Sequence, residues 1–164
     1  MPFTRAIVCP PAESFDTGIT SAALGPPDWT LALEQHEAYC RALERLGLTL
    51  ARLAPDPTYP DGTFVEDAAI VTTRGAILTR PGAASRAGEV AAVEPVLANW
   101  FPELSAIIDP GTADGGDCCE AGEDVSGAHG DSEGSRVKGS TALCQRPAAL
   151  VPTPNTTGTP GPPP

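Results

Sequence analysis

The distribution of aromatic residues limits what this chain can fold into. All eight Phe, Trp and Tyr residues lie at or before Phe101, whereas the 40 residues from Val125 to Pro164 contain 22 Gly, Pro, Ser and Thr. A segment of that composition buries too little apolar surface to offset the conformational entropy lost on ordering. We therefore predict one ordered domain over residues 1–124 and a disordered tail over residues 125–164.

Charge changes at the same boundary. Residues 1–124 contain seven Arg, no Lys and 19 acids, while the rest of the chain carries a net charge of +1. The overall net charge of −11 disfavours binding to nucleic acid or to an anionic membrane surface and weakly favours a cationic partner. The alternative is that the acidity serves solubility alone.

The apolar runs do not indicate a membrane protein, and the cysteines do not indicate a metal site. No apolar run has the length of a membrane span, and the start "MPFTRAIVCPPAESFD" lacks the apolar region of a signal peptide, so we predict a cytoplasmic protein. The five cysteines are odd in number and lack zinc-ligand spacing, which disfavours a disulfide framework and a metal site. We predict no cofactor, and we interpret Cys118 and Cys119 as small strand residues.

The order of apolar patterns predicts an α/β fold. A strand "RAIVCP" precedes the helix "PPDWTLALEQHEAYCRALERLGL", with Asp28 as N-cap, Gly47 as its stop, and an apolar face through Ala32, Tyr39, Leu43 and Leu46. The next predicted elements are a strand "LTLARLAP", two strands in "FVEDAAIVTTRGAILTRPG" around Arg74-Gly75, a helix "SRAGEVAAVEPVLANWF" bent at Pro95, and strands in "LSAIIDPG" and "GGDCCEAGED". This alternation suggests a repeated α/β module.

Acids and one arginine occupy the predicted strand ends. Glu66 and Asp67 interrupt the apolar run "FVEDAAIV"; in a strand they would point to opposite faces, so one of them would need a buried partner. The others are Asp61 in "YPDG", Arg86 at the second helix, and Asp114 and Asp117 in "DGGD". Carboxylates so placed suit a guanidinium or ammonium ligand, and Arg86 suits an α-carboxylate. The alternatives are a turn former at Asp61, a surface arginine at residue 86 and an Asx-turn at Asp117.

These residues carry a family resemblance. The stretches "TSAALGPPDWTLALEQHEAYCRALERLGL", "YPDGTFVEDAAIVTTRGAILTRPGAASRAGE" and "PGTADGGD" resemble the dimethylarginine dimethylaminohydrolase (dimethylargininase) family of guanidino-group-modifying enzymes, from about Arg5 to Asp124. The resemblance implies a pentein fold, a five-module α/β propeller with the ligand in a central channel, of which about two modules are expected here. It implies an enzyme of arginine metabolism, which hydrolyses Nω-methylated arginine to citrulline and a methylamine.

The resemblance also assigns roles to single residues. Asp67 corresponds to the acid that grips the substrate guanidinium, and Arg86 to the residue that binds the substrate carboxylate. Asp61 and Glu66 correspond to two neighbouring substrate contacts. Ile19 corresponds to an apolar residue of the mobile loop over the site, and Asp114 to the acid that orients the catalytic histidine.

The chain departs from the family after Asp124. The family's later modules supply a second substrate-binding arginine, a histidine and a nucleophilic cysteine, and we expect a truncated chain without them, as a frame or splice error would produce. His129 and Cys144 lie in a segment with no periodicity to fix their geometry, which disfavours a catalytic pair. Missing modules would expose apolar surface and strand edges, which leaves homo-oligomerisation open.

Three hypotheses follow. The chain is the N-terminal part of a dimethylargininase-like hydrolase that is inactive alone, or a non-catalytic module that binds a guanidino compound, or an assembly fragment with no ligand.

Overall fold

The computed structural model describes residues 3–72, 75–121 and 124–127 of the chain. It contains two α-helices, four short 3₁₀ helices and seven short strands within these ranges, which confirms the predicted α/β class. In chain order they are β1 (Arg5–Val8), η1 (Phe15–Thr17), α1 (Trp29–Arg45), β2 (Thr49–Arg52), η2 (Val65–Ala68), β3 (Ala69–Thr72), β4 (Gly75–Leu78), η3 (Ala84–Arg86), α2 (Val90–Trp100), β5 (Leu104–Ala106), η4 (Gly115–Asp117), β6 (Cys118–Ala121) and β7 (Asp124–Gly127).

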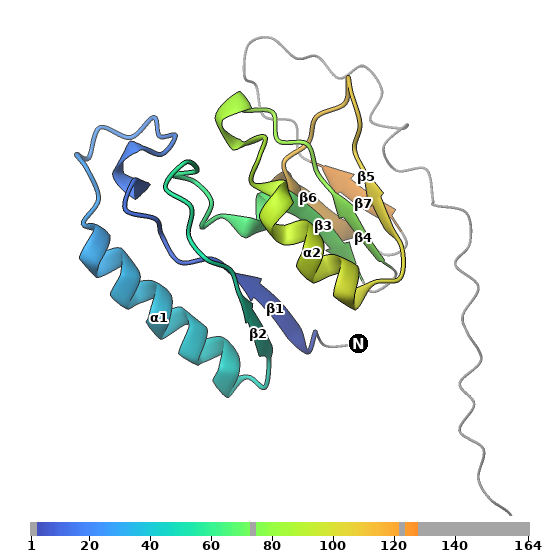
Figure 1. Ribbon diagram of the computed structural model, residues 1–164, viewed down its shortest axis with the longest axis horizontal. Coiled ribbons are helices and arrows are strands. Elements are labelled where there is room, and N and C mark those ends of the chain that lie inside the picture. The colour runs from blue at the N-terminus through green and yellow to red at the C-terminus, as the bar shows by residue number, and fades with distance from the viewer. Residues whose placement is uncertain (1–2, 73–74, 122–123, 128–164) are drawn as a thin grey trace, which may run out of the picture.

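A strand–helix–strand unit occurs twice (Figure 1). β1 and β2 pair in parallel on either side of α1 in the sequence, and β4 and β5 pair in parallel on either side of α2. Parallel neighbours need such a crossover connection, because a tight turn cannot return the chain to the same end. β3 adds an antiparallel edge to β4, and β6 pairs antiparallel with β7. The predicted repeated α/β module therefore exists in the topology.

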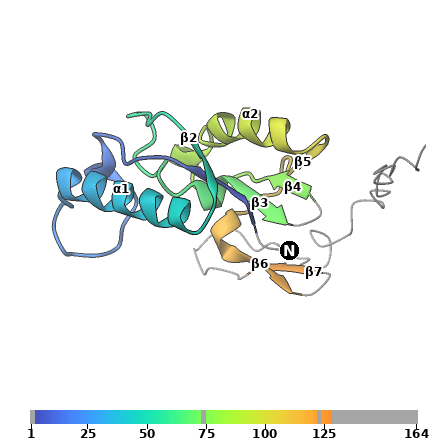
Figure 2. The ribbon, with the colours of Figure 1, turned by 90° about the horizontal axis from the view of Figure 1, so that it is seen from below.

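The second unit is layered (Figure 2). Helix α2 covers one side of the β3–β4–β5 sheet, and the β6–β7 hairpin lies on the opposite side of that sheet. Helix α1 lies along the β1–β2 pair at the other end of the molecule (Figure 1).

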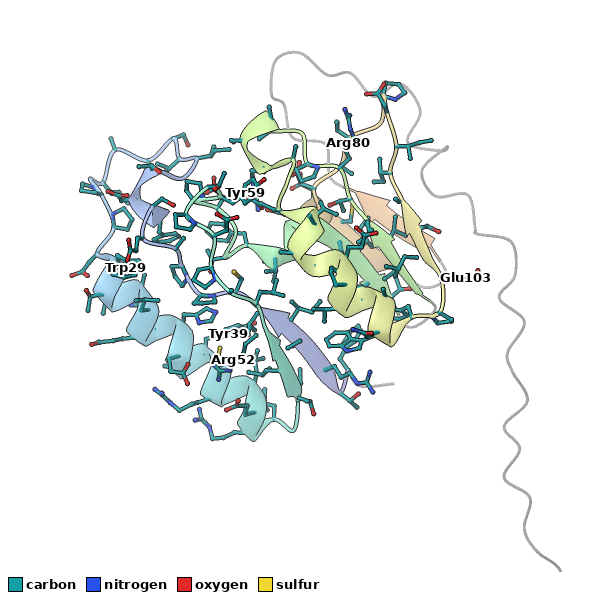
Figure 3. The ribbon with its side chains drawn as sticks, in the orientation of Figure 1. Trp29, Tyr39, Arg52, Tyr59, Arg80 and Glu103 are labelled. Carbon is teal, nitrogen blue, oxygen red and sulfur yellow. The ribbon has the colours of Figure 1, made fainter. Side chains whose placement is uncertain are left out.

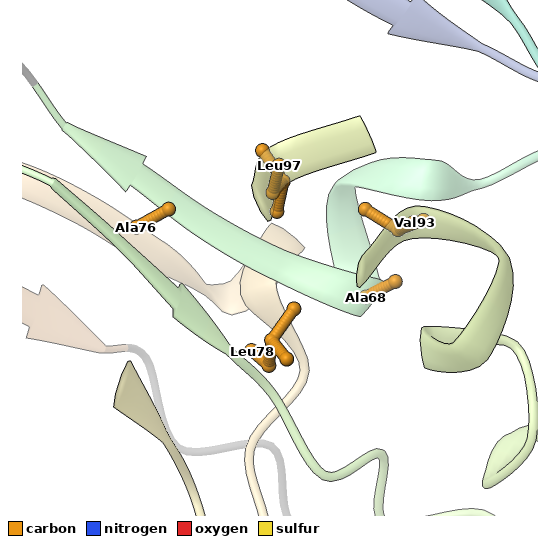
Figure 4. Close-up of a cluster of buried hydrophobic side chains, with 5 residues drawn as sticks. All are labelled: Ala68, Ala76, Leu78, Val93 and Leu97. Carbon is orange, nitrogen blue, oxygen red and sulfur yellow. The ribbon is translucent and has the colours of Figure 1, made fainter. Parts of the chain in front are cut away.

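Both units contribute to one apolar core. Its buried centre is a cluster from η2, β4 and α2 (Figure 4), formed by Ala68, Ala76, Leu78, Val93 and Leu97. Ile7 of β1 and Leu53 after β2 pack against this cluster from the first unit. The Arg5 guanidinium adds a cation–π contact at 5.7 Å from the centre of the Trp100 ring. The two units are therefore held together by shared apolar burial.

The ends of α1 are set by the two predicted residues. The carboxylate of Asp28 accepts the Leu31 N–H at 3.0 Å, which satisfies a backbone donor that has no partner inside the helix. Gly47 follows the last turn with φ of +88°, a conformation that a residue with a Cβ adopts only with strain. The predicted cap and stop are confirmed.

The predicted apolar face of α1 is wrong in part. Tyr39 is 57% exposed and Leu46 77% exposed, whereas Cys40 is completely buried. The face toward the molecule passes through Cys40 and half-buried residues at helical spacing from it, Ala32, His36 and Leu43. His36 and Cys40 lie one helical turn apart on this face, and the Cys40 sulfur contacts His36 Nδ1 at 3.7 Å.

Other elements differ from their predicted bounds. The run "FVEDAAIV" is η2 followed by β3 rather than one strand. The second helix is shorter than predicted, since Ser85 and Arg86 belong to η3 and α2 begins at Val90. β5 ends at Ala106, and the first three residues of "GGDCCEAGED" form η4 before β6 begins.

Strand β7 crosses the predicted boundary at residue 124. Asp124 to Gly127 pair with β6 in the register Cys118↔Gly127 to Ala121↔Asp124, so the first residues of the predicted tail satisfy backbone groups of β6 instead of being disordered. The rest of the tail, with His129 and Cys144, and also Arg74 of the predicted turn, lie outside the described residues.

Replacement of Leu97 by alanine should cost about 2–5 kcal/mol of unfolding free energy, because the side chain is completely buried and a cavity would remain. The matched control is Leu24→Ala at a leucine that is 92% exposed, which should change stability by less than about 0.5 kcal/mol. Urea unfolding followed by circular dichroism measures both values, and equal effects would contradict the assigned core.

The stability of the chain should fall between pH 7.5 and pH 5.5 in part through His36. Desolvation by burial and then the Arg52 charge lower the pKa of His36 in the folded chain. The unfolded chain therefore takes up the proton first, and the stabilisation present above the unfolded value of 6.5 is lost as pH falls toward the folded value. His36→Gln should reduce the stability difference between these two pH values, and an unchanged difference would contradict this role.

Candidate functional site

The guanidinium of Arg86 lies at the centre of a buried ion cluster. Its Nε donates to both carboxylate oxygens of Glu89 at 3.1 Å, and Nη2 donates to Glu89 Oε2 at 2.7 Å. Nη1 donates to Asp67 Oδ2 at 2.5 Å. The side chains of Arg86 and Glu89 are only 10% and 6% exposed, and that of Asp67 is 20% exposed. Three charged groups are thus removed from most of the solvent together.

Arg86 also fixes the loop before η2. Nη2 donates to the carbonyls of Asp61 at 3.3 Å and Phe64 at 3.2 Å. A guanidinium has five N–H donors. The hydrogen bonds described above supply acceptors for all of them except the second N–H of Nη1.

The electrostatics keep Arg86 charged. Desolvation by burial acts to lower the pKa of Arg86, but hydrogen bonds to Glu89 and Asp67 outweigh it, and the pKa is raised above its ordinary value. Removal of either acid would leave part of a buried charge without a partner, which is costly.

Asp67 is held from its other side by η4. Its Oδ1 accepts the Gly116 N–H at 2.9 Å. A Cβ at Gly116 would lie 2.4 Å from that oxygen, and a Cβ at Gly115 would lie 2.2 Å from the Glu66 carbonyl. The close approach of η2 and η4 thus requires both glycines. Oδ1 accepts the Gly116 N–H and Oδ2 accepts Arg86 Nη1, so each Asp67 oxygen can still accept one further hydrogen bond.

Asp61 anchors the loop that carries Ile19. Both Asp61 carboxylate oxygens lie 3.1 Å from the Ile19 backbone nitrogen, which donates to them. Asp61 is 6% exposed, whereas Ile19 is 63% exposed. The Ile19 side chain is thus presented at the surface by a loop that is fixed at its base.

Asp114 and Glu66 border the same cluster. Asp114 Oδ2 accepts the Gly82 N–H at 3.3 Å, and the Asp114 carbonyl accepts the Asp117 N–H at 3.2 Å at the start of η4. Glu66 is exposed on η2, with its side chain beside Gly116.

The predicted site residues are therefore gathered around η2 rather than scattered. Asp67 and Arg86 are in direct contact, the Asp61 backbone contacts Arg86, and Ile19 is bonded to the Asp61 carboxylate. Asp114 reaches the group through η4, whose Gly116 binds Asp67.

Glu89 is the member of the cluster that sequence reasoning missed. It follows Arg86 by three residues, a spacing at which opposite charges meet on a helical turn. That spacing was visible in "SRAGE", and only the burial of the pair was not.

A cysteine and a histidine also meet away from this cluster. The Cys40 sulfur lies 3.7 Å from His36 Nδ1 on α1. Desolvation raises the pKa of the Cys40 thiol, although Arg52 opposes the shift, and the pKa of His36 is lowered by desolvation. The buried sulfur is therefore protonated at neutral pH and is a poor nucleophile.

The part of the chain that the structure describes has neither a metal-binding cluster nor a membrane-spanning helix. None of its clusters of His, Cys, Asp and Glu has the three members needed to hold a metal ion. None of its helices is long and apolar enough to cross a membrane.

Comparison with known proteins supports a relationship along most of the chain. No protein-family model matches it. The N(G),N(G)-dimethylarginine dimethylaminohydrolase of Pseudomonas aeruginosa is 41% identical over 138 residues, which are 82% of this chain and 54% of that protein. The corresponding protein of Streptomyces coelicolor is 38% identical over 76% of this chain and 49% of its own length.

The fold agrees with the sequence match. A crystal structure of the Pseudomonas aeruginosa dimethylarginine dimethylaminohydrolase, a variant in complex with citrulline, superposes with a TM-score of 0.74 at 42% identity and covers 76% of this chain and 49% of that one. The chain thus spans about half the length of the curated relatives it matches. By sequence and fold together, it belongs to the dimethylarginine dimethylaminohydrolase family.

Proposed function

We propose that this chain carries the acidic, guanidinium-binding part of a dimethylargininase-type site, which acts on methylated arginine to give citrulline and a methylamine. The observation that carries the proposal is the state of Asp67. Its carboxylate is held in place by Arg86 and Gly116, is partly open to solvent, and keeps capacity for two further donors. A planar guanidinium supplies donors in that pairwise geometry.

The neighbouring residues fit the remaining parts of an arginine-like ligand. Glu66 is exposed next to Asp67 on η2, and the remaining N–H of Arg86 can donate to a ligand carboxylate. Ile19, presented by the loop that Asp61 anchors, supplies an apolar cover over the alkyl part of the ligand. In a complete site, Asp114 would orient a proton-transferring histidine.

The proposal extends to the architecture. We assign the two strand–helix–strand units to about two modules of a five-module pentein propeller. We retain a boundary near residue 124 between these modules and the Gly/Pro/Ser/Thr-rich segment, with β7 at the edge of the first part. Cytoplasmic location and self-association belong to the same proposal.

The two other hypotheses differ from this one in what they expect of ligands. A non-catalytic module would bind arginine-like ligands through Asp67 with no turnover in any context, and an assembly fragment would bind none. The well-held, partly open Asp67 favours ligand binding over assembly alone.

Replacement of Asp67 by asparagine should weaken binding of L-arginine and of asymmetric dimethylarginine by about 10- to 150-fold, since one hydrogen bond to a charged group is worth about 1.5–3 kcal/mol. The matched control is Glu103→Gln, an exposed acid at the far end of the molecule (Figure 3). Isothermal titration calorimetry measures both. Equal affinity in wild type and Asp67→Asn, with both variants folded, would remove the guanidinium-binding proposal.

The 164-residue chain alone should release no citrulline from dimethylarginine above the rate of a buffer blank. In the described residues the histidine, His36, bonds to Cys40 on α1 and not to the acids around η2, so proton transfer there lacks a base. A colorimetric citrulline assay measures this. Turnover that is lost in Cys144→Ser would show instead that the later segment supplies a nucleophile.

A further inference from the structure

We propose that Glu89 is a positioning residue that neutralises Arg86 and thereby leaves the charge of Asp67 available to a cationic ligand. Glu89 makes no contact of its own with the open side of Asp67 and acts only through Arg86. The inference rests on the proposed function, because it concerns how the same site favours a guanidinium.

The geometry fixes the pairing. Glu89 takes Nε and Nη2 of Arg86, so the guanidinium presents Nη1 alone to Asp67. The Asp61 and Phe64 carbonyls share Nη2 from the other side. Because Arg86 cannot rotate without breaking these bonds, Nη1 meets only Oδ2 and leaves Oδ1 to Gly116 and a ligand.

Because Glu89 and Arg86 are buried, solvent screens their charges only weakly. Glu89 is 7% exposed and lines a small, mainly apolar pocket with Cys9, Tyr59 and Val93. The Tyr59 side chain also packs so closely over Gly88 that a Cβ there would lie 1.8 Å from its hydroxyl. Solvent screens a pair in such a setting far less than it screens a surface pair.

The net charge of Asp67, Arg86 and Glu89 determines which ligand charge the site favours. Arg86 and Asp67 alone would be neutral and would offer no net attraction to a cation. With Glu89 the cluster of Asp67, Arg86 and Glu89 carries a net charge of −1, and Asp67 is the member that is open to a ligand. Glu89 should therefore favour a cationic guanidinium over a neutral ureido group of the same shape.

The test compares L-arginine with L-citrulline, which differ at the terminal group in charge. Calorimetry measures both affinities for the wild-type chain, Glu89→Gln, and Glu94→Gln, an exposed acid on the same stretch of chain. Loss of the Glu89 charge should lower the ratio of arginine to citrulline affinity by about 3- to 30-fold, and Glu94→Gln should leave it unchanged. A merely structural role would weaken both ligands equally, and that result would overturn the inference while leaving the proposed function intact.

Two further measurements keep the test decisive. If Glu89→Gln does not fold by circular dichroism, Glu89→Asp replaces it; it keeps the negative charge beside Arg86 and should keep the wild-type preference for arginine, and loss of that preference would overturn the inference. The Arg86 Nε–H signal in nuclear magnetic resonance reports the pairing without a ligand, and rapid exchange of that proton in wild type would also overturn it.

Absence of binding by wild type to both ligands, with a slowly exchanging Arg86 Nε–H, would reject the proposed function. It would then leave Glu89 as a structural partner of Arg86 and overturn the inference with it.

Discussion

The buried guanidinium of Arg86 is the interaction on which the rest of the described structure depends. It joins η3 to Glu89 ahead of α2, to Asp67 in η2, and to the carbonyls of the loop at Asp61 and Phe64. Desolvation of one cation and two carboxylates is costly, and the cost is offset only because nearly every donor of the guanidinium has an acceptor. The segments around it can therefore adopt few other arrangements.

The same constraint explains why η2 is not a strand. A strand through Glu66 and Asp67 would need ladder partners for its backbone, but Arg86 takes the Phe64 carbonyl and the Thr79 hydroxyl takes the Asp67 carbonyl at 2.5 Å. The Phe64 carbonyl also accepts the Asp67 N–H at 3.2 Å, which closes a 3₁₀ turn, and β3 begins after it at Ala69. The turn brings Asp67 onto Arg86 and Gly116.

A feature can be predicted from the sequence when the residues that cause it are neighbours in the chain. The α1 cap at Asp28 and the stop at Gly47 depend on neighbouring residues, so the sequence alone indicates them. The η2 turn depends on Arg86, some twenty residues later, and no local pattern reveals it. Likewise Glu66 and Asp67 stand out as charges within an apolar run, whereas Glu89 resembles an ordinary helix residue until its burial is known.

Core and candidate site meet within η2 itself. Ala68 is 2% exposed in the apolar cluster with Val93 and Leu97, and the residue before it is Asp67. A 3₁₀ helix turns about 120° per residue, so adjacent side chains are fixed at a set angle to each other. A shift of Ala68 would therefore move the Asp67 carboxylate as well and disturb its bond to Arg86. Because Ile7 and Leu53 of the first unit pack on that cluster, the position of this acid depends on both strand–helix–strand units.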